Sequence, residues 1–394
     1  MAAVALPVAL AGLAAAFVWW AVGTLRLRRA LGAATVADTA LLVAALRGRE
    51  GDRARPLFVD PLAKRLAGQR GAALVALTRR FPVSMDFVAA RTVAIDGMVR
   101  RLTGVEDGLG APPVDTVLNL AAGLDARPFR LPLPPTLRWL DVDVPAILAR
   151  KHDVVLRGHS DADDACSTGG GSGGPTSHAP RGAVAAPVSS AVPTASDLGP
   201  LATPLFTCGP AARPDPAAAT ATAKAAAAGR PGTAEAVCAY AAYTADLARP
   251  VDRRRILGLV PADARCVAIT EGLLNYLQEA DVRALARELH AHPGIQYWIA
   301  DVGGAKAVAL LDLAARYLFS RGHAVAYHFG PRNVPAFFAE EGWHTVELAA
   351  IPDVLREAGR WAWYERLLFT LVPPARRNLY DVVLLAKDPA PRRK

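Results

Sequence analysis

The chain has 394 residues with a formal net charge of +9, and 52% of them are hydrophobic. This length suits two average domains or one large one. The basic residues occur in scattered pairs and triplets without interleaved aromatics, so we expect no nucleic-acid partner. The four cysteines form no C-x-x-C pair and no histidine–cysteine cluster, which argues against a metal site and a disulfide framework.

Residues 2–25 carry no charged side chain. Phe17, Trp19 and Trp20 lie near the end of this segment, and a group of arginines begins at Arg26. Its length suffices to cross a bilayer as a helix, and the charges behind it favour a cytosolic remainder. We therefore interpret residues 1–30 as a membrane anchor for a cytosolic catalytic domain. An organelle-targeting peptide and an apolar helix of a cytoplasmic protein are the alternatives.

The next part of the chain has helical periodicity. From Thr35 to Arg101, apolar residues recur at spacings of three and four, and Pro56 and Pro61 interrupt the pattern. We expect these helices to form a cap in front of a sheet.

Residues 114–143 are the most informative stretch. An apolar run from Val114 to Leu120 leads into a turn of small residues, and a second apolar run ends on Asp141 and Asp143. Asp143 follows the turn residue Gly123 by about 20 positions, which is the layout of a nucleotide site in an open α/β sheet. The turn would let a ligand approach the backbone, and the carboxylate would accept the ribose hydroxyls.

The composition of the turn favours one type of nucleotide. A dinucleotide fingerprint requires G-x-G-x-x-G, but the corresponding positions are Ala121, Gly123 and Ala126. Most of the glycines that let a pyrophosphate approach a helix are therefore missing. One glycine with two alanines suits a ligand without phosphates, such as S-adenosylmethionine.

Residues 158–235 form a Gly-, Ala-, Pro- and Thr-rich stretch with almost no large apolar side chains. Such a stretch buries too little surface to offset its ordering entropy, so we predict a disordered insertion within one domain. A linker between two domains is the alternative. Beyond it, strand patterns at 265–270, 295–302, 343–348 and 379–386 alternate with helical patterns that begin near Gln278 and Pro331. The alternation predicts a mostly parallel sheet covered on both faces, in a single domain made of residues 31–157 and 236–390.

Several segments together resemble the leucine carboxyl methyltransferase family, a branch of the class I S-adenosylmethionine-dependent methyltransferases, and in particular its actinobacterial branch. They are TALLVAALR (39–47), PLFVDPLAKRL (56–66), VAARTVAIDGMV (88–99), LNLAAGLDARPFRL (118–131), LDVDVPAILARK (140–151), ADLARP (245–250) and ITEGLLNYL (269–277). The resemblance covers about 39–157 and 236–388. It implies a Rossmann-like α/β fold with a seven-stranded, mostly parallel sheet and a helical N-terminal cap.

The resemblance also implies S-adenosyl-L-methionine as the cofactor and a role for each matching residue. Arg91 would bind the cofactor's carboxylate, and Glu271 would lie near its amino-acid end. Gly123 would receive the methionine part against its backbone, and Asp143 would bind the ribose, with Asp141 as a competitor. Asp246 and Leu247 would read the adenine.

Two neighbouring residues have a different expected role. Asp125 and Arg127 are expected to form a structural pair that shapes the turn rather than to bind the cofactor.

The predicted reaction is transfer of a methyl group to a carboxylate or hydroxyl oxygen. A carboxylate is already ionised at neutral pH and needs no general base, so no catalytic residue is singled out. A hydroxyl acceptor would need a base, for which His323 and His328 are candidates. The acceptor itself, a small molecule or a protein C-terminal carboxylate, and the oligomeric state do not follow from the sequence.

Two other functions remain open at this point. One is an NAD(P)-dependent reductase on a similar sheet, and the other is a non-catalytic membrane-bound adaptor that retains the fold.

Overall fold

A computed structural model describes residues 36–78, 85–108, 110–156, 206–208, 236–309, 326–371 and 378–387. Its helices are α2 Val36–Gly51, α3 Ala63–Thr78, α4 Phe87–Leu102, α5 Arg127–Arg130, α6 Pro145–Leu156, α9 Pro250–Leu257, α10 Glu279–Ala291, α12 Val334–Glu340, α13 Ile351–Glu357 and α14 Trp363–Leu371, with a short 3-10 helix at Leu274–Tyr276. Its strands are β1 Thr116–Leu120, β2 Arg138–Asp143, β3 Phe206–Cys208, β4 Ala239–Thr244, β5 Cys266–Thr270, β6 Ile295–Gly303, β7 His344–Ala350 and β8 Tyr380–Ala386.

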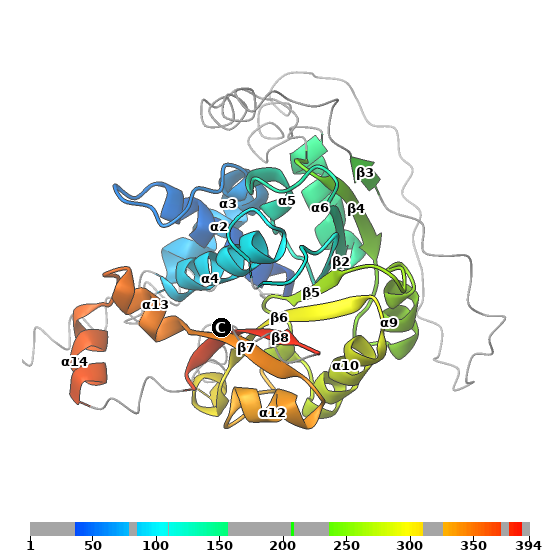
Figure 1. Ribbon diagram of the computed structural model, residues 1–394. Coiled ribbons are helices and arrows are strands. Elements are labelled where there is room, and N and C mark those ends of the chain that lie inside the picture. The colour runs from blue at the N-terminus through cyan, green and yellow to red at the C-terminus, as the bar shows by residue number, and fades with distance from the viewer. Residues whose placement is uncertain are drawn as a thin grey trace, which may run out of the picture.

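The strands form one sheet in the order β3-β4-β2-β1-β5-β6-β8-β7 (Figure 1). The five central strands from β4 to β6 are parallel, whereas β8 is antiparallel to both β6 and β7. The predicted mostly parallel α/β sheet is therefore confirmed, and the three-residue edge strand β3 adds to its seven longer strands.

Helices cover both faces of the sheet because the central strands are apolar on both sides. Side chains from α9, α10 and α12 pack against one face, through strand residues such as Leu118, Leu140 and Ala268. Side chains from α4 and α13 pack against the other, through residues such as Val117 and Trp139. Figure 1 shows the sheet between these two groups of helices.

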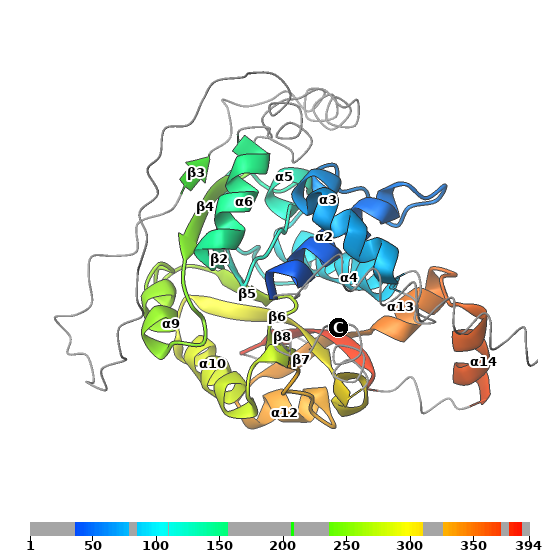
Figure 2. The same cartoon turned by 180° about the vertical axis from the view of Figure 1, so that it is seen from behind.

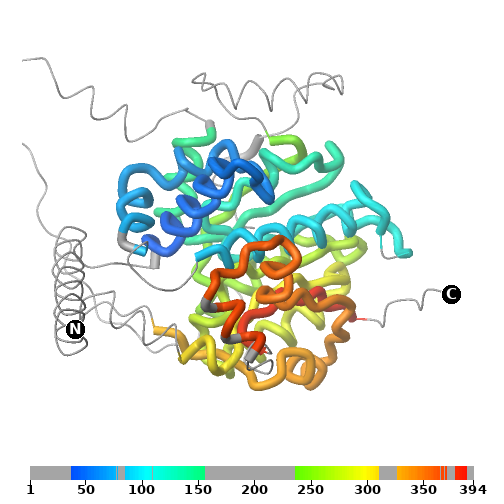
Figure 3. The backbone as a smooth tube through the Cα atoms, turned by 90° about the vertical axis from the view of Figure 1, so that its left-hand side faces the viewer, coloured from blue at the N-terminus to red at the C-terminus, as the bar shows by residue number. Residues whose placement is uncertain are grey.

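The helical N-terminal cap is also confirmed. Helices α2 and α3 pack together and onto α6, through a separate apolar cluster that contains Leu41, Leu66 and Ile147. Seen from behind, α2 and α3 lie beside α6 (Figure 2). Helix α13 packs against α4 close to α14, as the tube view shows (Figure 3).

The prediction of a membrane-anchored protein is corrected. Within the described ranges, no helix is both long and apolar enough to cross a bilayer. The transmembrane interpretation, the membrane partner and the membrane localisation drawn from the sequence are therefore not supported. Residues 2–25, on which they depended, lie outside the described residues.

The sheet is continuous across the predicted insertion. Strand β2 precedes residues 158–235, strand β4 follows them, and the two pair in parallel from Arg138 to Asp143. Within the insertion only Phe206–Cys208 is described, and it pairs antiparallel with β4. The remainder lies outside the described residues, so its disorder stays a prediction.

Candidate functional site

Three carboxylates lie in line along one edge of the sheet. The last paired rung of β1 is Leu120, which lies opposite Val142 of β2 and Thr270 of β5. Asp143 and Glu271 follow one position beyond this rung. Thr270 is in turn opposite Ala300 of β6, so Asp301 belongs to the same line. Parallel strands bring their carboxyl ends to one edge, and ligands of open α/β sheets bind there.

Strand alternation also places these carboxylates on one face. Successive side chains of a strand point to opposite faces. Val142 and Ala268 pack on the face covered by α9 and α10, whereas Val267 and Ile269 pack on the face covered by α4. Asp143 is one position beyond Val142, and Glu271 is two positions beyond Ile269. Both side chains are therefore on the face covered by α4, the helix that carries Arg91.

A glycine turn connects the end of β1 to Asp143. Gly123 has a φ of +54° and donates its backbone N–H to Asp143 Oδ2 at 2.6 Å. The N–H of Val144 binds the other oxygen, Oδ1, at 2.7 Å. Burial raises the pKa of Asp143, and the two N–H groups oppose that shift. Each oxygen keeps acceptor capacity after these bonds, as a contact to hydroxyl groups requires.

The space beside Gly123 suits a ligand that lies against the backbone. A β-carbon built on Gly123 would have Ala40 Cβ as its nearest neighbour, at 3.9 Å. No described atom therefore crowds this face of the turn. Contact of Gly123 with the methionine part and of Asp143 with the ribose of S-adenosylmethionine stays a prediction.

Arg91 is buried at the other end of the line. Its Nη1 donates to Asp301 Oδ2 at 2.8 Å and to the Tyr380 hydroxyl at 3.3 Å, and its Nη2 lies 3.0 Å from Glu271 Oε1. Tyr380 Oη also donates to Asp301 Oδ2 at 2.7 Å. These acidic neighbours outweigh the effect of burial and hold the pKa of Arg91 above its usual value.

Glu271 joins Arg91 to a second buried arginine. Its Oε2 accepts from Arg127 Nη1 at 2.6 Å. Burial alone would raise the pKa of Glu271, but Arg127 and Arg91 outweigh it and lower the pKa to about 2. Glu271 is therefore an ionised hydrogen-bond acceptor near neutral pH and a poor general base.

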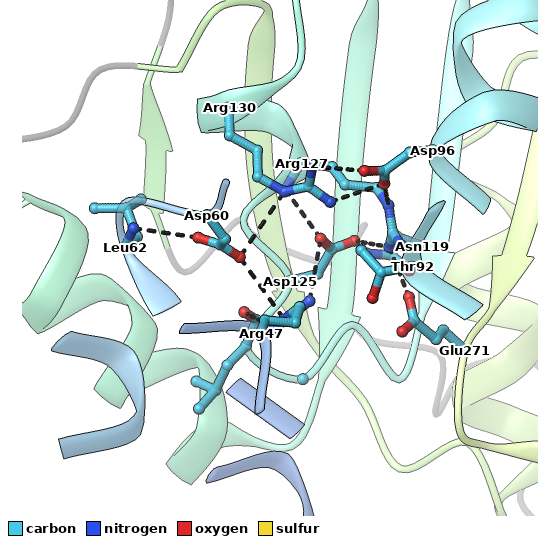
Figure 4. Close-up of polar contacts among 12 residues, drawn as sticks. Arg47, Asp60, Leu62, Thr92, Asp96, Asn119, Asp125, Arg127, Arg130 and Glu271 are labelled. Atoms are coloured by element: carbon cyan, nitrogen blue, oxygen red, sulfur yellow. Dashed lines mark hydrogen bonds and ion pairs between the residues drawn. The ribbon is translucent and has the colours of Figure 1, made fainter. Parts of the chain in front are cut away.

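Glu271 and Arg127 also belong to a larger network of polar contacts (Figure 4). Arg127 Nη1 binds Asp125 Oδ2 at 2.9 Å, which confirms the predicted structural pair, and Arg127 Nε binds Asp96 Oδ1 at 2.7 Å. The Asp125 carboxylate also accepts the Arg127 backbone N–H at 2.9 Å, so it fixes the turn that contains Gly123. Further members of the network are Arg47, Asp60 and Arg130.

Asn119 of β1 connects this network to a second buried pair. Its Nδ2 donates to Asp125 Oδ2 at 3.1 Å and to Asp141 Oδ1 at 3.0 Å. Asp141 also accepts from Lys151 and, at 2.7 Å, from the Tyr240 hydroxyl. Because Asp141 is fully buried and engaged in this way, it does not compete with Asp143 for a ligand.

Asp246 and Leu247 follow β4, whose last paired residue, Thr244, lies opposite Asp143. The Asp246 side chain is exposed, and its Oδ1 accepts the Ala248 N–H at 3.0 Å. Leu247 is buried, and its carbonyl accepts from Arg253 at 3.0 Å. Asp246 and Leu247 therefore follow the strand end beside Asp143, and their contact with an adenine stays a prediction.

Sequence reasoning missed Asp301 and Tyr380. Asp301 is near the end of the apolar run 295–302, just as Asp143 and Glu271 are at the ends of their runs. Its position in the sequence could therefore have identified it as a candidate site residue. Tyr380 offered none, because only its pairing with Gly303 across β6 and β8 brings it to this edge. Of the candidate bases, His328 is exposed and His323 lies outside the described residues.

The strand order, the antiparallel β8 between β6 and β7, and an acidic residue at the end of β2 that accepts an N–H of the glycine turn after β1 define the class I methyltransferase fold. The comparison with protein families agrees with this architecture. The profile of the leucine carboxyl methyltransferase family matches residues 40–168.

Similar proteins carry related names. A provisionally named S-adenosyl-L-methionine-dependent methyltransferase from Mycobacterium ulcerans is 33% identical over 130 residues, which are 31% of this chain and 42% of the relative. The tetracenomycin polyketide synthesis O-methyltransferase TcmP of Streptomyces glaucescens is 32% identical over 113 residues, which are 29% of this chain and 39% of TcmP. These matches span about two fifths of the relatives' length.

A solved structure of a provisionally named methyltransferase from Thermobifida fusca aligns with 90% of this chain and 95% of its own. Its sequence identity is 14% and its TM-score is 0.43.

Proposed function

We propose that the protein is an S-adenosylmethionine-dependent O-methyltransferase that methylates a carboxylate or hydroxyl oxygen of a small molecule or a protein C-terminus. The observation that carries the proposal is the contact between the Gly123 turn and Asp143, in line with Glu271 at the same edge and on the same face. These are the residue types that a nucleoside with an amino-acid tail requires. The family match supports the cofactor and leaves the acceptor open.

The electrostatics of the turn favour a nucleoside without phosphates. A pyrophosphate is normally held by the N-terminus of a helix that follows the first strand. Here α5 has only 4 residues, and Asp125 lies just before it. A short helix behind a carboxylate attracts anions weakly, which counts against the NAD(P)-dependent reductase.

The mechanism assigned to this chain is positioning. Asp143 would accept the ribose hydroxyls, Asp246 and Leu247 would contact the adenine, and Arg91 with Glu271 would orient the amino-acid tail. When bound, S-adenosylmethionine supplies a sulfonium methyl group. An acceptor oxygen held in line with that methyl group would receive it, with S-adenosylhomocysteine as the other product. Such orientation can lower a barrier by about 7–11 kcal/mol at best.

A carboxylate acceptor suits the ionisable groups near Arg91. The pKa of Glu271 is lowered to about 2, and burial raises the pKa of Tyr380 above its usual value, with Asp301 adding to the shift. Neither group would accept a proton and release it again near neutral pH. A carboxylate needs no such group, whereas a hydroxyl acceptor would require a base from elsewhere, such as His328.

Calorimetric titration with S-adenosylhomocysteine tests the proposal. The wild type should bind it, and NADPH under the same conditions should not bind. Asp143→Ala and Arg91→Ala should each weaken binding by about 1–3 kcal/mol, because a polar contact to a charged group is lost.

Asp263→Ala is the matched control, since this exposed aspartate precedes β5 at the opposite edge of the sheet. The proposal fails if the folded wild type binds NADPH but not S-adenosylhomocysteine, or if the control weakens binding as much as Asp143→Ala.

A further inference from the structure

Arg47 of the cap helix α2 reaches the turn that follows β1. Its Nη2 donates to the carbonyl oxygen of Leu124 at 2.6 Å, although the two residues are 77 positions apart in the chain. Leu124 directly follows Gly123. The Arg47 side chain is only 3% exposed, so this charge-assisted hydrogen bond is shielded from water and is stronger than one between neutral groups. The turn of the candidate site is therefore attached to a helix outside the sheet.

Carboxylates of the cap and of the turn hold the guanidinium of Arg47 between them (Figure 4). Its Nη1 lies 3.8 Å from Asp125 Oδ1, and its Nε lies 3.7 Å from Asp60 Oδ2. Asp125 belongs to the turn, whereas Asp60 lies between α2 and α3 and accepts the N–H of Leu62 at 3.1 Å. Burial alone would raise the pKa of Asp125, but Arg127 and Arg47 outweigh it and hold that pKa below its usual value. The position of Arg47 is therefore fixed from both sides.

The same face of α2 also lies beside Gly123. Ala40 precedes Arg47 by seven residues, which is about two turns of an α-helix, so the two side chains are on one face. Ala40 is the nearest neighbour of a β-carbon built on Gly123, at 3.9 Å. One face of the cap helix therefore extends along the turn, from the glycine to the residues that follow it.

We propose that Arg47 is a positioning residue that holds the Gly123 turn in the conformation that receives the cofactor, so that docking of the cap helix and binding of the cofactor are coupled. Arg47 acts without touching the ligand, because the Leu124 carbonyl and the Asp125 carboxylate transmit its effect to the turn. By thermodynamic linkage, a ligand that binds the turn then stabilises the docked α2 by the same factor. The inference rests on the proposed function and adds a residue of the cap to it.

Calorimetry of Arg47→Met with S-adenosylhomocysteine tests this inference. Methionine keeps an unbranched side chain but removes every donor, so the folded variant should bind about tenfold more weakly than the wild type.

Arg65→Met is the matched control. Arg65 of α3 donates its Nη2 to the carbonyl of Val154 at 2.9 Å, so it also joins the cap to the rest of the domain, but at the last turn of α6 instead of the Gly123 turn. This variant should bind S-adenosylhomocysteine within about twofold of the wild type.

Equal losses of affinity in the two variants, or an unchanged affinity in folded Arg47→Met, overturn the inference, whereas binding by the wild type still supports the proposed function. Absence of binding to the wild type overturns both. If Arg47→Met does not fold, Arg47→Lys replaces it with Arg65→Lys as its control, because lysine keeps the charge but lacks the planar fork that faces the carbonyl and the two carboxylates. Arg47→Lys should then weaken binding at least about threefold more than its control, and equal effects overturn the inference.

Hydrogen exchange provides a measurement that a purely structural role of Arg47 would not change. In the wild type, saturating S-adenosylhomocysteine should slow the exchange of the backbone amides at 46–50, near the end of α2 far from Ala40, at least about threefold. The same amides in folded Arg47→Met should show no such slowing, and the amides of α12 should be unaffected in both proteins. Exchange at 46–50 that is independent of the ligand in the wild type, or slowed equally in both proteins, overturns the inference.

Discussion

Ala121 adopts a backbone conformation that side chains disfavour. Its φ is +54°, in the left-handed region that glycine enters freely and that costs other residues about 1–2 kcal/mol. It lies two residues before Gly123, which has the same φ. The turn of the candidate site therefore contains strain at the position where the sequence has alanine instead of glycine.

Ala121→Gly should raise the free energy of unfolding by up to about 1 kcal/mol, because relief of the left-handed strain exceeds the extra chain entropy of glycine. Denaturant unfolding measures the change. Ala122→Gly is the matched control and should be destabilising, since Ala122 is buried and its φ is not positive. Destabilisation of equal size in both variants would contradict the account.

A site residue could be predicted from the sequence when its signal was local, and not when it depended on contacts between distant parts of the chain. Gly123, Asp143 and Glu271 could be singled out in the sequence because each ends or follows an apolar run. The partners of Arg91 were not found, since Asp301 is 210 residues away and Tyr380 is 289 residues away along the chain. Only the pairing of β6 with β8 brings them together.

Strand β8 contains a buried acid between two neighbouring strands. Asp381 lies opposite Val302 of β6 and Ala350 of β7. Burial, with a contribution from Asp353, raises its pKa from 3.8 to about 6. Its protonated form is therefore favoured in the folded state, so its contribution to stability is complete below pH 4 and is lost as the pH rises through about 6.

Asp381→Asn should consequently be more stable than the wild type above pH 6, by about 2 kcal/mol, and the difference should vanish near pH 4. Urea unfolding at several pH values between 4 and 8 measures it. Asp263→Asn, at an exposed position, should show no such trend. A difference between Asp381→Asn and the wild type that is independent of pH would rule out titration of Asp381 as the cause.

At the scale of the whole molecule, the alternation of strand and helix patterns predicted the α/β class and the helical cap. The order of the strands in the sheet could not be predicted from this alternation, because neighbouring strands such as β2 and β4 are separated by residues 158–235. Local patterns determine which elements form, and long-range packing determines their neighbours. The membrane interpretation was drawn from a local pattern of apolar, aromatic and basic residues.

Replacement of residues 160–200 by a Gly–Ser linker of about 20 residues should leave the fold and the binding of S-adenosylhomocysteine intact. The variant retains Phe206–Cys208, which pairs with β4. The loop-closure entropy changes little when a loop is shortened by this amount. Thermal unfolding and calorimetry compare the variant with the full chain. Loss of cooperative unfolding would show that the replaced residues belong to the core.

The place of β8 between β6 and β7 affects the order in which the sheet can be assembled during synthesis. Strand β7 is translated before β8, yet among the described strands β8 is its sole partner. Until Tyr380–Ala386 has emerged from the ribosome, one side of β6 and both sides of β7 present unpaired backbone groups, which are templates for aggregation. These edges stay exposed until β8 is made, and the environment of Arg91 is completed only when β8 supplies Tyr380.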